Sequence, residues 1–171
     1  MFEYLAPFSR IIVTGPQRSG TTICAAMIAH DLGYRLCLED KIATDSYTQA
    51  ALLIAASRNF VLQAPALCHY AERLSIPQMA IVLMRRGIED IVASEHRIGW
   101  HGSAHHKWEL QKYGVEDGVI SEIKYAYWEI YQQSRIHNPF EVEYESLAAH
   151  PMWIPKEERV NFRSRQYQRV P

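Results

Sequence analysis

The feature that most constrains the fold is an expected strand at residues 10–13, apolar from Ile11 to Val13, which leads into G-P-Q-R-S-G-T-T at residues 15–22 and then into a helical pattern. A strand, a glycine-rich turn and a helix in this order direct backbone N–H groups and the positive end of a helix dipole at one enclosed point. Gly15 and Gly20 allow the turn and the close approach of a ligand. The segment therefore predicts a phosphate-binding loop, with a tight turn that binds nothing as the alternative.

Short apolar segments and helical patterns alternate along the rest of the chain. The expected strands are residues 10–13, 34–38, 59–63, 79–84 and 140–143, and the expected helices are residues 21–30, 46–57, 67–74, 88–98 and 119–135. Residues 99–118 are expected to form a polar loop, and the tail from Glu145 to form helix and loop. Continuous apolar strands separated by helices are typical of a parallel sheet that is covered on both faces.

We therefore predict one α/β domain over residues 1–171, a three-layer α/β/α fold of the P-loop type. Its central sheet is mainly parallel and has about four to five strands. In such a sheet, ligands bind at the carboxyl ends of the strands, where the strand order reverses.

Composition excludes several classes of protein. The 171 residues include 18 basic and 19 acidic side chains, and this balance argues against a nucleic-acid-binding protein. The longest apolar run is far shorter than the roughly 20 residues of a membrane span, and the N-terminus has no signal-peptide pattern. Cys24, Cys37 and Cys68 fit neither a disulfide framework nor a zinc site, so we expect reduced thiols in a cytoplasmic protein. Oligomeric state leaves no signal in the sequence.

The loop differs from the nucleoside-triphosphate pattern G-x-x-x-x-G-K-[ST] at a decisive position. Thr21 occupies the place of the lysine, and the basic residue of the loop is Arg18. The third expected strand ends at Gln63 and the fourth leads into two arginines, so neither supplies the aspartate that usually helps to hold Mg²⁺. These residues favour a phosphate-bearing ligand that is held by arginines without a metal ion.

Four segments resemble motifs of the P-loop sulfotransferase superfamily and occur in the family's order. P-x-R-S-G-T-T at residues 16–22 is similar to its 5′-phosphosulfate loop. I-V-L-M-R-R-G-I-E-D-I-V-A-S at residues 81–94 resembles its 3′-phosphate segment, with Arg86, Asp90 and Ser94 on the family's Arg, Asp and Ser. V-E-Y-E-S-L-A-A-H-P at residues 142–151 and, more weakly, Q-A-P at residues 63–65 are the other two matches.

The resemblance implies a sulfuryl transfer from 3′-phosphoadenosine 5′-phosphosulfate (PAPS) as donor co-substrate, which leaves 3′,5′-bisphosphoadenosine (PAP). The acceptor would be a hydroxyl or amine of a small molecule, carbohydrate or peptide, and no metal is required. Arg86 and Ser94 would hold the 3′-phosphate, and Arg18 would stabilise charge on the bridging oxygen. Asp90 is expected to be structural, because a carboxylate repels a phosphate. The implied contacts to the 5′ side are Gly15, Pro16, Gln17, Arg18, Ser19, Gly20, Thr21 and Thr22.

An acceptor hydroxyl also needs a base within hydrogen-bond reach. Glu39 and Asp40 follow the second expected strand, where several members of the family place a glutamate, and Glu39 is the first choice. The alternative is a solvated acidic loop. The rival bases are His96, His101, His105 and His106. No cysteine or carboxylate lies at a spacing that would complete a zinc site with these histidines. The basic tail at residues 163–169 would either close on the 3′-phosphate or remain solvated.

Three features depart from the family pattern. Gln63 stands where some members have a transition-state lysine, although its amide can still donate a hydrogen bond, and Ile88 replaces a proline. The chain is also shorter than typical members. Two alternatives therefore stay open: a non-catalytic PAP- or PAPS-binding protein on the same fold, and a nucleotide or small-molecule kinase with a degenerate P-loop.

Overall fold

A computed structural model describes residues 1–39, 47–65, 71–74, 76–100 and 138–155, together with positions 67, 107, 110, 111, 114, 126 and 136. The strands are β1 (Arg10–Thr14), β2 (Arg35–Leu38), β3 (Phe60–Gln63), β4 (Met79–Arg85) and β5 (Phe140–Glu143). The α-helices are α1 (Thr21–Leu32), α2 (Tyr47–Ala56) and α3 (Ile88–Arg97). Three 3-10 helices, η1 (Glu3–Leu5), η4 (Ala71–Arg73) and η6 (Tyr144–Ala149), complete the described elements.

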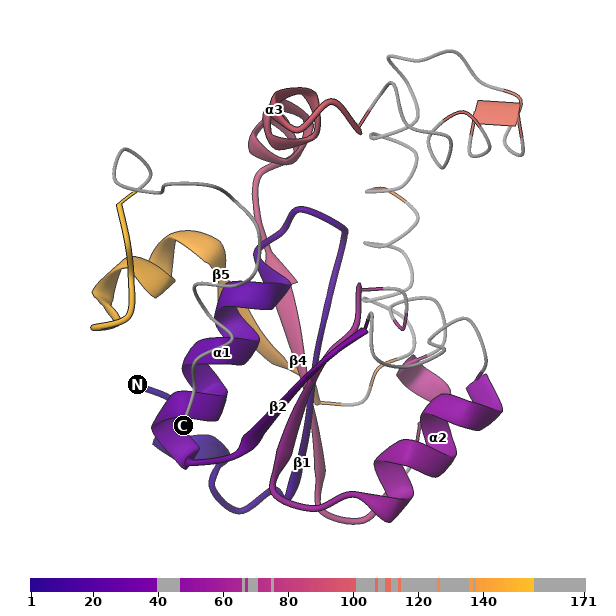
Figure 1. Cartoon of the computed structure of the whole chain (residues 1–171), viewed down its shortest axis with the longest axis vertical. Coiled ribbons are helices and arrows are strands. Elements are labelled where there is room, and N and C mark those ends of the chain that lie inside the picture. Colours follow the sequence, from indigo (N-terminus) through magenta and orange to yellow (C-terminus); the bar gives the residue numbers. More distant parts are fainter. Residues whose placement is uncertain are drawn as a thin grey trace.

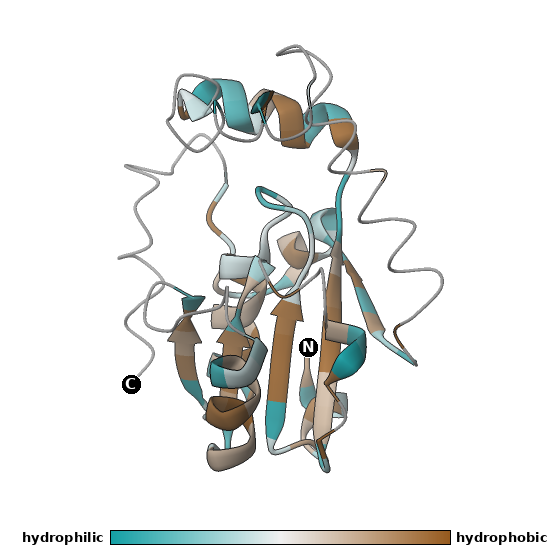
Figure 2. Ribbon diagram, turned by 90° about the vertical axis from the view of Figure 1, so that its right-hand side faces the viewer, coloured by the Kyte–Doolittle hydropathy of each residue, from teal (hydrophilic) through white to brown (hydrophobic). Residues whose placement is uncertain are grey.

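The five strands form one parallel sheet in the order β2-β3-β1-β4-β5, as the sequence predicts. The chain leaves the central strand β1 toward one side, to β2, and later returns to its other side as β4. The strand order therefore reverses at β1, and ligands of such sheets bind beyond the carboxyl ends of the strands at this point. The glycine-rich loop leaves β1 at that end, and α3 lies beyond the same end of the sheet (Figures 1 and 2).

Different helices cover the two faces of the sheet (Figure 1). Ile11 and Val13 share one buried cluster with α1, whereas Ile12 lies in a second buried cluster with α2. Successive side chains of a strand point to opposite faces, so a strand that is covered on both faces must be apolar throughout. This explains the unbroken apolar run from Ile11 to Val13 in β1 and confirms the layered α/β fold.

A buried arginine joins α2 to the sheet. Arg10, at the start of β1, is 4% exposed, and its Nε donates to the carbonyl oxygen of Ile54 at 2.8 Å. Its two terminal nitrogens donate to the carbonyls of Ala55 and Pro77, each at 2.9 Å. The Ile54 and Ala55 carbonyls belong to the last turn of α2, where a cation interacts favourably with the helix dipole. The charge of Arg10 is therefore satisfied and fixes the end of α2.

The described residues of two other expected segments are helical in the 3-10 form. Of the helix expected at 67–74, Leu67 and Ala71–Arg73 have this geometry. The tail expected to form helix and loop begins in the six-residue 3-10 helix η6, which starts at Tyr144.

The structure corrects one prediction, the polar loop at 99–118. Lys107, Leu110 and Gln111 are helical there, and all three are good helix formers. Of the helix expected at 119–135, Ala126 is described and is helical. The basic tail at 163–169 lies outside the described residues. No helix in the described part is long and apolar enough to cross a bilayer.

Candidate functional site

The loop between β1 and α1 has the backbone geometry of a ligand cradle. Gly15 and Gly20 have φ angles of +145° and +99°, which side-chain-bearing residues rarely adopt. Arg18, although it carries a side chain, has a φ of +68°, a strained conformation that is common at ligand-binding sites. The backbone N–H and the hydroxyl of Ser19 both donate to the carbonyl of Pro16, at 3.2 and 2.7 Å, and close the turn.

Both glycines are also needed for space. A Cβ on Gly15 would lie 3.0 Å from the carbonyl oxygen of Met84 in β4, and a Cβ on Gly20 would collide with the ring of Tyr144. Gly20 is in addition the N-cap of α1, and no side-chain oxygen of the described residues caps the helix there. The first N–H groups of α1 are therefore left to face the loop, which favours an anion.

Three arginines from separate segments meet beside this loop. Arg86 Nη1, just beyond β4, donates to the carbonyl oxygen of Arg18 at 2.9 Å, although the two residues are 68 positions apart. Arg18 Nε donates to Ser94 Oγ in α3 at 3.2 Å, and Arg97 Nη2 donates to the same oxygen at 3.3 Å. The structure thus brings together Arg18, Arg86 and Ser94, which the sequence singled out, and adds Arg97.

The electrostatics of the cluster favour an anionic ligand. Burial lowers the pKa of the Arg18 guanidinium, and the like charges of Arg97 and Arg86 lower it further, while Glu95 acts in the opposite direction. A negative charge between these groups would relieve their repulsion. The cluster is consequently a candidate site for a negatively charged ligand.

Arg86 is held in position by Tyr144 from η6. Its guanidinium carbon lies 4.0 Å from the centre of the Tyr144 ring, a cation–π arrangement. The same ring packs against Gly20 and makes an edge contact with Trp153 at 5.4 Å between centroids. Arg86 Nε is buried and has no hydrogen-bond partner among the described residues. A buried N–H without a hydrogen-bond partner lowers the stability of the fold by about 1–3 kcal/mol, and a bound oxyanion would supply that partner.

The candidate catalytic residues of the strand ends are connected through Gln63. The Gln63 side chain is 6% exposed, and its Nε2 donates to Thr21 Oγ1 at 3.2 Å. The backbone N–H of Glu39, directly after β2, donates to Gln63 Oε1 at 3.5 Å. Gln63 thus joins β2, β3 and the start of α1. Asp40 lies outside the described residues.

The remaining predicted residues lie around the same loop or outside the described chain. Gln17 Oε1 is buried without a hydrogen-bond partner in the described part, and Thr22 is half-buried in the first turn of α1. Asp90 and His96 are exposed on α3. The other rival bases, His101, His105 and His106, are not among the described residues. Arg97 escaped the sequence analysis, although its position three residues after Ser94 on a helix was a usable signal.

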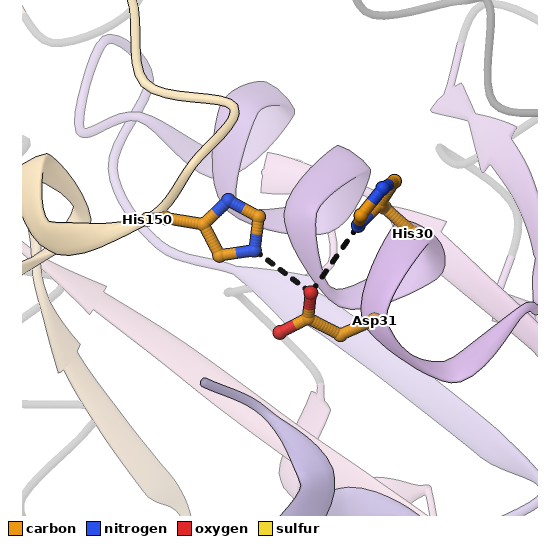
Figure 3. Close-up of side chains that lie close together, drawn as sticks. All are labelled: His30, Asp31 and His150. Atoms are coloured by element: carbon orange, nitrogen blue, oxygen red, sulfur yellow. Dashed lines mark hydrogen bonds and ion pairs between the residues drawn. The ribbon is translucent and has the colours of Figure 1, made fainter.

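A second cluster of polar side chains lies at the other end of α1, about 15 Å along the helix from its first turn by the rise of an α-helix. Figure 3 shows its members His30, Asp31 and His150. His150 Nε2 and His30 Nδ1 lie 2.9 and 3.3 Å from Asp31 Oδ1. The other oxygen of Asp31 accepts from the amine of Met1 and the backbone N–H of Phe2, at 2.9 and 3.0 Å. Sequence reasoning missed this cluster, because His150 lies 119 positions from Asp31.

This second cluster has the residue types of a metal site, but its hydrogen bonds do not suit one. The side chains of His30, Asp31 and His150 offer ligand atoms that all lie within 4.8 Å of one another. However, the backbone N–H of Met152 donates to His150 Nδ1 at 3.1 Å, so a neutral His150 carries its proton on Nε2. That proton is donated to Asp31, which leaves no lone pair on Nε2 for a metal. The cluster is therefore a hydrogen-bonded clamp on the end of α1.

Of the comparisons with known proteins, one with a solved structure bears on the fold. No family model matches the sequence, and no curated protein matches it. The solved structure of the YorR protein from Bacillus subtilis, in complex with phosphorylated GDP, is similar with a TM-score of 0.50 and 12% sequence identity, over 79% of this chain and 86% of that chain. The structure of APE1195 has a TM-score of 0.36 and 10% identity, over 75% and 97% of the two chains. The likeness to YorR supports an α/β fold of the kind found in a nucleotide-bound protein.

Replacement of Gly20 by alanine tests the packing of the loop against Tyr144. We expect Gly20→Ala to lower the free energy of unfolding by about 2–4 kcal/mol, because backbone strain and overpacking add. Gly33→Ala is the matched control: Gly33 has a φ of +64°, and no described atom lies within 4 Å of the added Cβ. We expect it to cost only about 1 kcal/mol. Urea unfolding measures both, and equal losses would contradict the contact with Tyr144.

Asp31→Asn tests the clamp through its dependence on pH. Partial burial alone would raise the pKa of Asp31, but the hydrogen bonds from the Met1 amine, His150, Phe2 and His30 together hold it well below its usual range. The carboxylate therefore stabilises the fold above the unfolded-state pKa, and this contribution is lost as the pH falls through the folded-state pKa. We expect the variant to be less stable by about 1–3 kcal/mol at pH 7.

The difference between wild type and Asp31→Asn should shrink steadily below about pH 4, near the unfolded-state pKa. Glu145→Gln, at an exposed position in η6, is the control and should show no such trend. Chemical denaturation at a series of pH values measures this, and a difference independent of pH would refute the role of the Asp31 charge.

Proposed function

We propose that this chain is a sulfotransferase that transfers a sulfuryl group from PAPS to a hydroxyl or amine of an acceptor. One observation supports the proposal most: Arg86 and Ser94 contact Arg18 of the phosphate loop across 68 and 76 positions of sequence. These are the residues that match the sulfotransferase motifs, and they meet where the strand order of the sheet reverses.

The proposed donor site has two anion-binding parts. The 5′-phosphosulfate binds at residues 15–22, where backbone N–H groups and the start of α1 stabilise negative charge. The 3′-phosphate binds at Arg86 and Ser94, where it supplies the partner that Arg86 Nε lacks among the described residues. Arginine suits this role because its planar guanidinium can donate two parallel hydrogen bonds to phosphate oxygens.

In the proposed reaction, an acceptor oxygen or nitrogen forms a bond to sulfur, and the bond from sulfur to the bridging oxygen breaks. The bonding electrons leave with PAP, and the acceptor proton passes to a base, for which Glu39 is the first candidate. Arg18 stabilises the charge that develops on the bridging oxygen. Arg18 Nε donates to Ser94 Oγ, so in this proposal the terminal nitrogens of the same guanidinium act on the bridging oxygen. The chemistry requires no metal ion.

In this proposal Gln63 does not replace the transition-state lysine that some family members have at this place. Its amide already donates to Thr21 and accepts from the backbone N–H of Glu39. It therefore orients the loop and the candidate base and adds no positive charge to the transition state. We expect a slower reaction than a lysine would support.

Turnover of PAPS by wild type and Arg18→Ala tests the proposal. PAP release is measured in EDTA with a panel of phenols, sugars and tyrosine-containing peptides as acceptors. We expect wild type to release PAP with one class of acceptor, and Arg18→Ala to lose about 10²–10³-fold in turnover. Its affinity for PAP should fall by about tenfold or less, because Arg86 and the loop backbone remain. Arg58→Ala, at an exposed position before β3, is the control.

Each other outcome identifies an alternative. Full turnover in Arg18→Ala would remove Arg18 from the mechanism. Tight PAP binding without transfer to any acceptor would indicate a PAP-binding protein on the same fold. Phosphoryl transfer from ATP that depends on Mg²⁺ would indicate a kinase with a degenerate P-loop.

A further inference from the structure

Arg97 in the last turn of α3 has no counterpart in the motifs that the sequence matches. It lies three residues after Ser94, which places both on one face of the helix, and its Nη2 donates to Ser94 Oγ at 3.3 Å. We propose that Arg97 determines the specificity of the second anion site, where it selects a nucleotide with a phosphate monoester on its ribose. The inference rests on the proposed function, since it concerns the donor site.

The hydrogen bonds of Ser94 leave its proton available to an acceptor. A hydroxyl can accept two hydrogen bonds and donate one. Ser94 Oγ accepts from both Arg18 Nε and Arg97 Nη2, so its acceptor capacity is used and its proton is left to donate. Ser94 is 2% exposed, and the buried carboxylate of Glu95 follows it in the chain. An oxyanion bound here would accept the proton of Ser94 and also pair with the guanidinium groups of Arg18 and Arg97.

The charge of the cluster favours a dianion over a monoanion. Arg97 and Arg86 both lower the pKa of Arg18, which means that the three charges are near enough to repel one another. A phosphate monoester carries about −1.5 to −2 charges at pH 7, whereas a diester carries one and a hydroxyl none. The third guanidinium therefore contributes most to the binding of a terminal phosphate.

Arg97 is a more selective target for substitution than Arg86. Arg97 lies at an exposed position of α3, while Arg86 packs on Tyr144 and donates to the loop backbone. Removal of Arg86 would therefore disturb the shape of the loop as well as the charge of the site. Removal of Arg97 takes a charge away from Ser94 and leaves the contacts of Arg86 with the loop in place.

The test is isothermal titration calorimetry of Arg97→Gln with adenosine 3′,5′-bisphosphate and adenosine 5′-phosphate. We expect the variant to lose about tenfold in affinity for the bisphosphate and less than about twofold for the monophosphate. Its affinity for the bisphosphate should also depend less on salt, because one fewer cation contacts the ligand. Arg73→Gln, an exposed arginine in η4, is the matched control and should leave both affinities unchanged.

The outcomes separate this inference from the proposed function. Equal losses for both nucleotides in Arg97→Gln, or no loss for either, would overturn the role of Arg97 even if wild type transfers sulfuryl groups from PAPS. If Arg97→Gln loses affinity for the bisphosphate alone, but wild type transfers no sulfuryl group from PAPS, the role of Arg97 is supported and the sulfotransferase is rejected. Absence of bisphosphate binding by wild type would overturn both.

Discussion

The guanidinium of Arg86 donates to the carbonyl of Arg18 and so attaches the end of β4 to the loop that follows β1. Tyr144 supports this contact from one side, since its ring lies against both Gly20 and the Arg86 guanidinium. The parallel sheet makes the contact possible, because parallel strands present their carboxyl ends at one edge. Arg18 in turn donates to Ser94, which also accepts from Arg97.

The two ends of α1 are stabilised in opposite ways. At the first turn, Gly20 leaves the helix N–H groups for an anion. At the last turn, the Asp31 carboxylate accepts hydrogen bonds from His150 and from the first two residues of the chain. A binding loop needs a rigid support, and the clamp at the far end of α1 provides one without chemistry of its own. The cluster thus resembles a metal site in composition only.

Local patterns in the sequence were sufficient to predict the strands, their parallel arrangement and the position of the loop. The apolar segment around Ile12 and the glycines at 15 and 20 determine these features within a few residues. Arg18, Arg86 and Ser94 were also predicted, and the structure brings them together, while their chemical roles stay predictions. The resemblance to sulfotransferase motifs made that selection possible, since composition alone does not pair distant residues.

Contacts between distant segments that match no motif could not be predicted. The link of Gln63 to both Thr21 and Glu39 depends on strand register, which spacing does not reveal. The buried pair of Asp31 and His150 joins residues 119 positions apart. A local apolar pattern also does not distinguish 3-10 from α geometry, and the described helical residues of the helix expected at 67–74 are of the 3-10 type.

The central claim is that the site binds a ribose bisphosphate through arginines and without a metal ion. A thermal-shift titration tests it most directly, with PAP and adenosine 5′-phosphate in EDTA and Mg-ATP in parallel. Ligands that bind the native state raise the melting temperature by mass action. The account predicts a large shift with PAP, a smaller one with adenosine 5′-phosphate and none with Mg-ATP. A shift with Mg-ATP alone would contradict it.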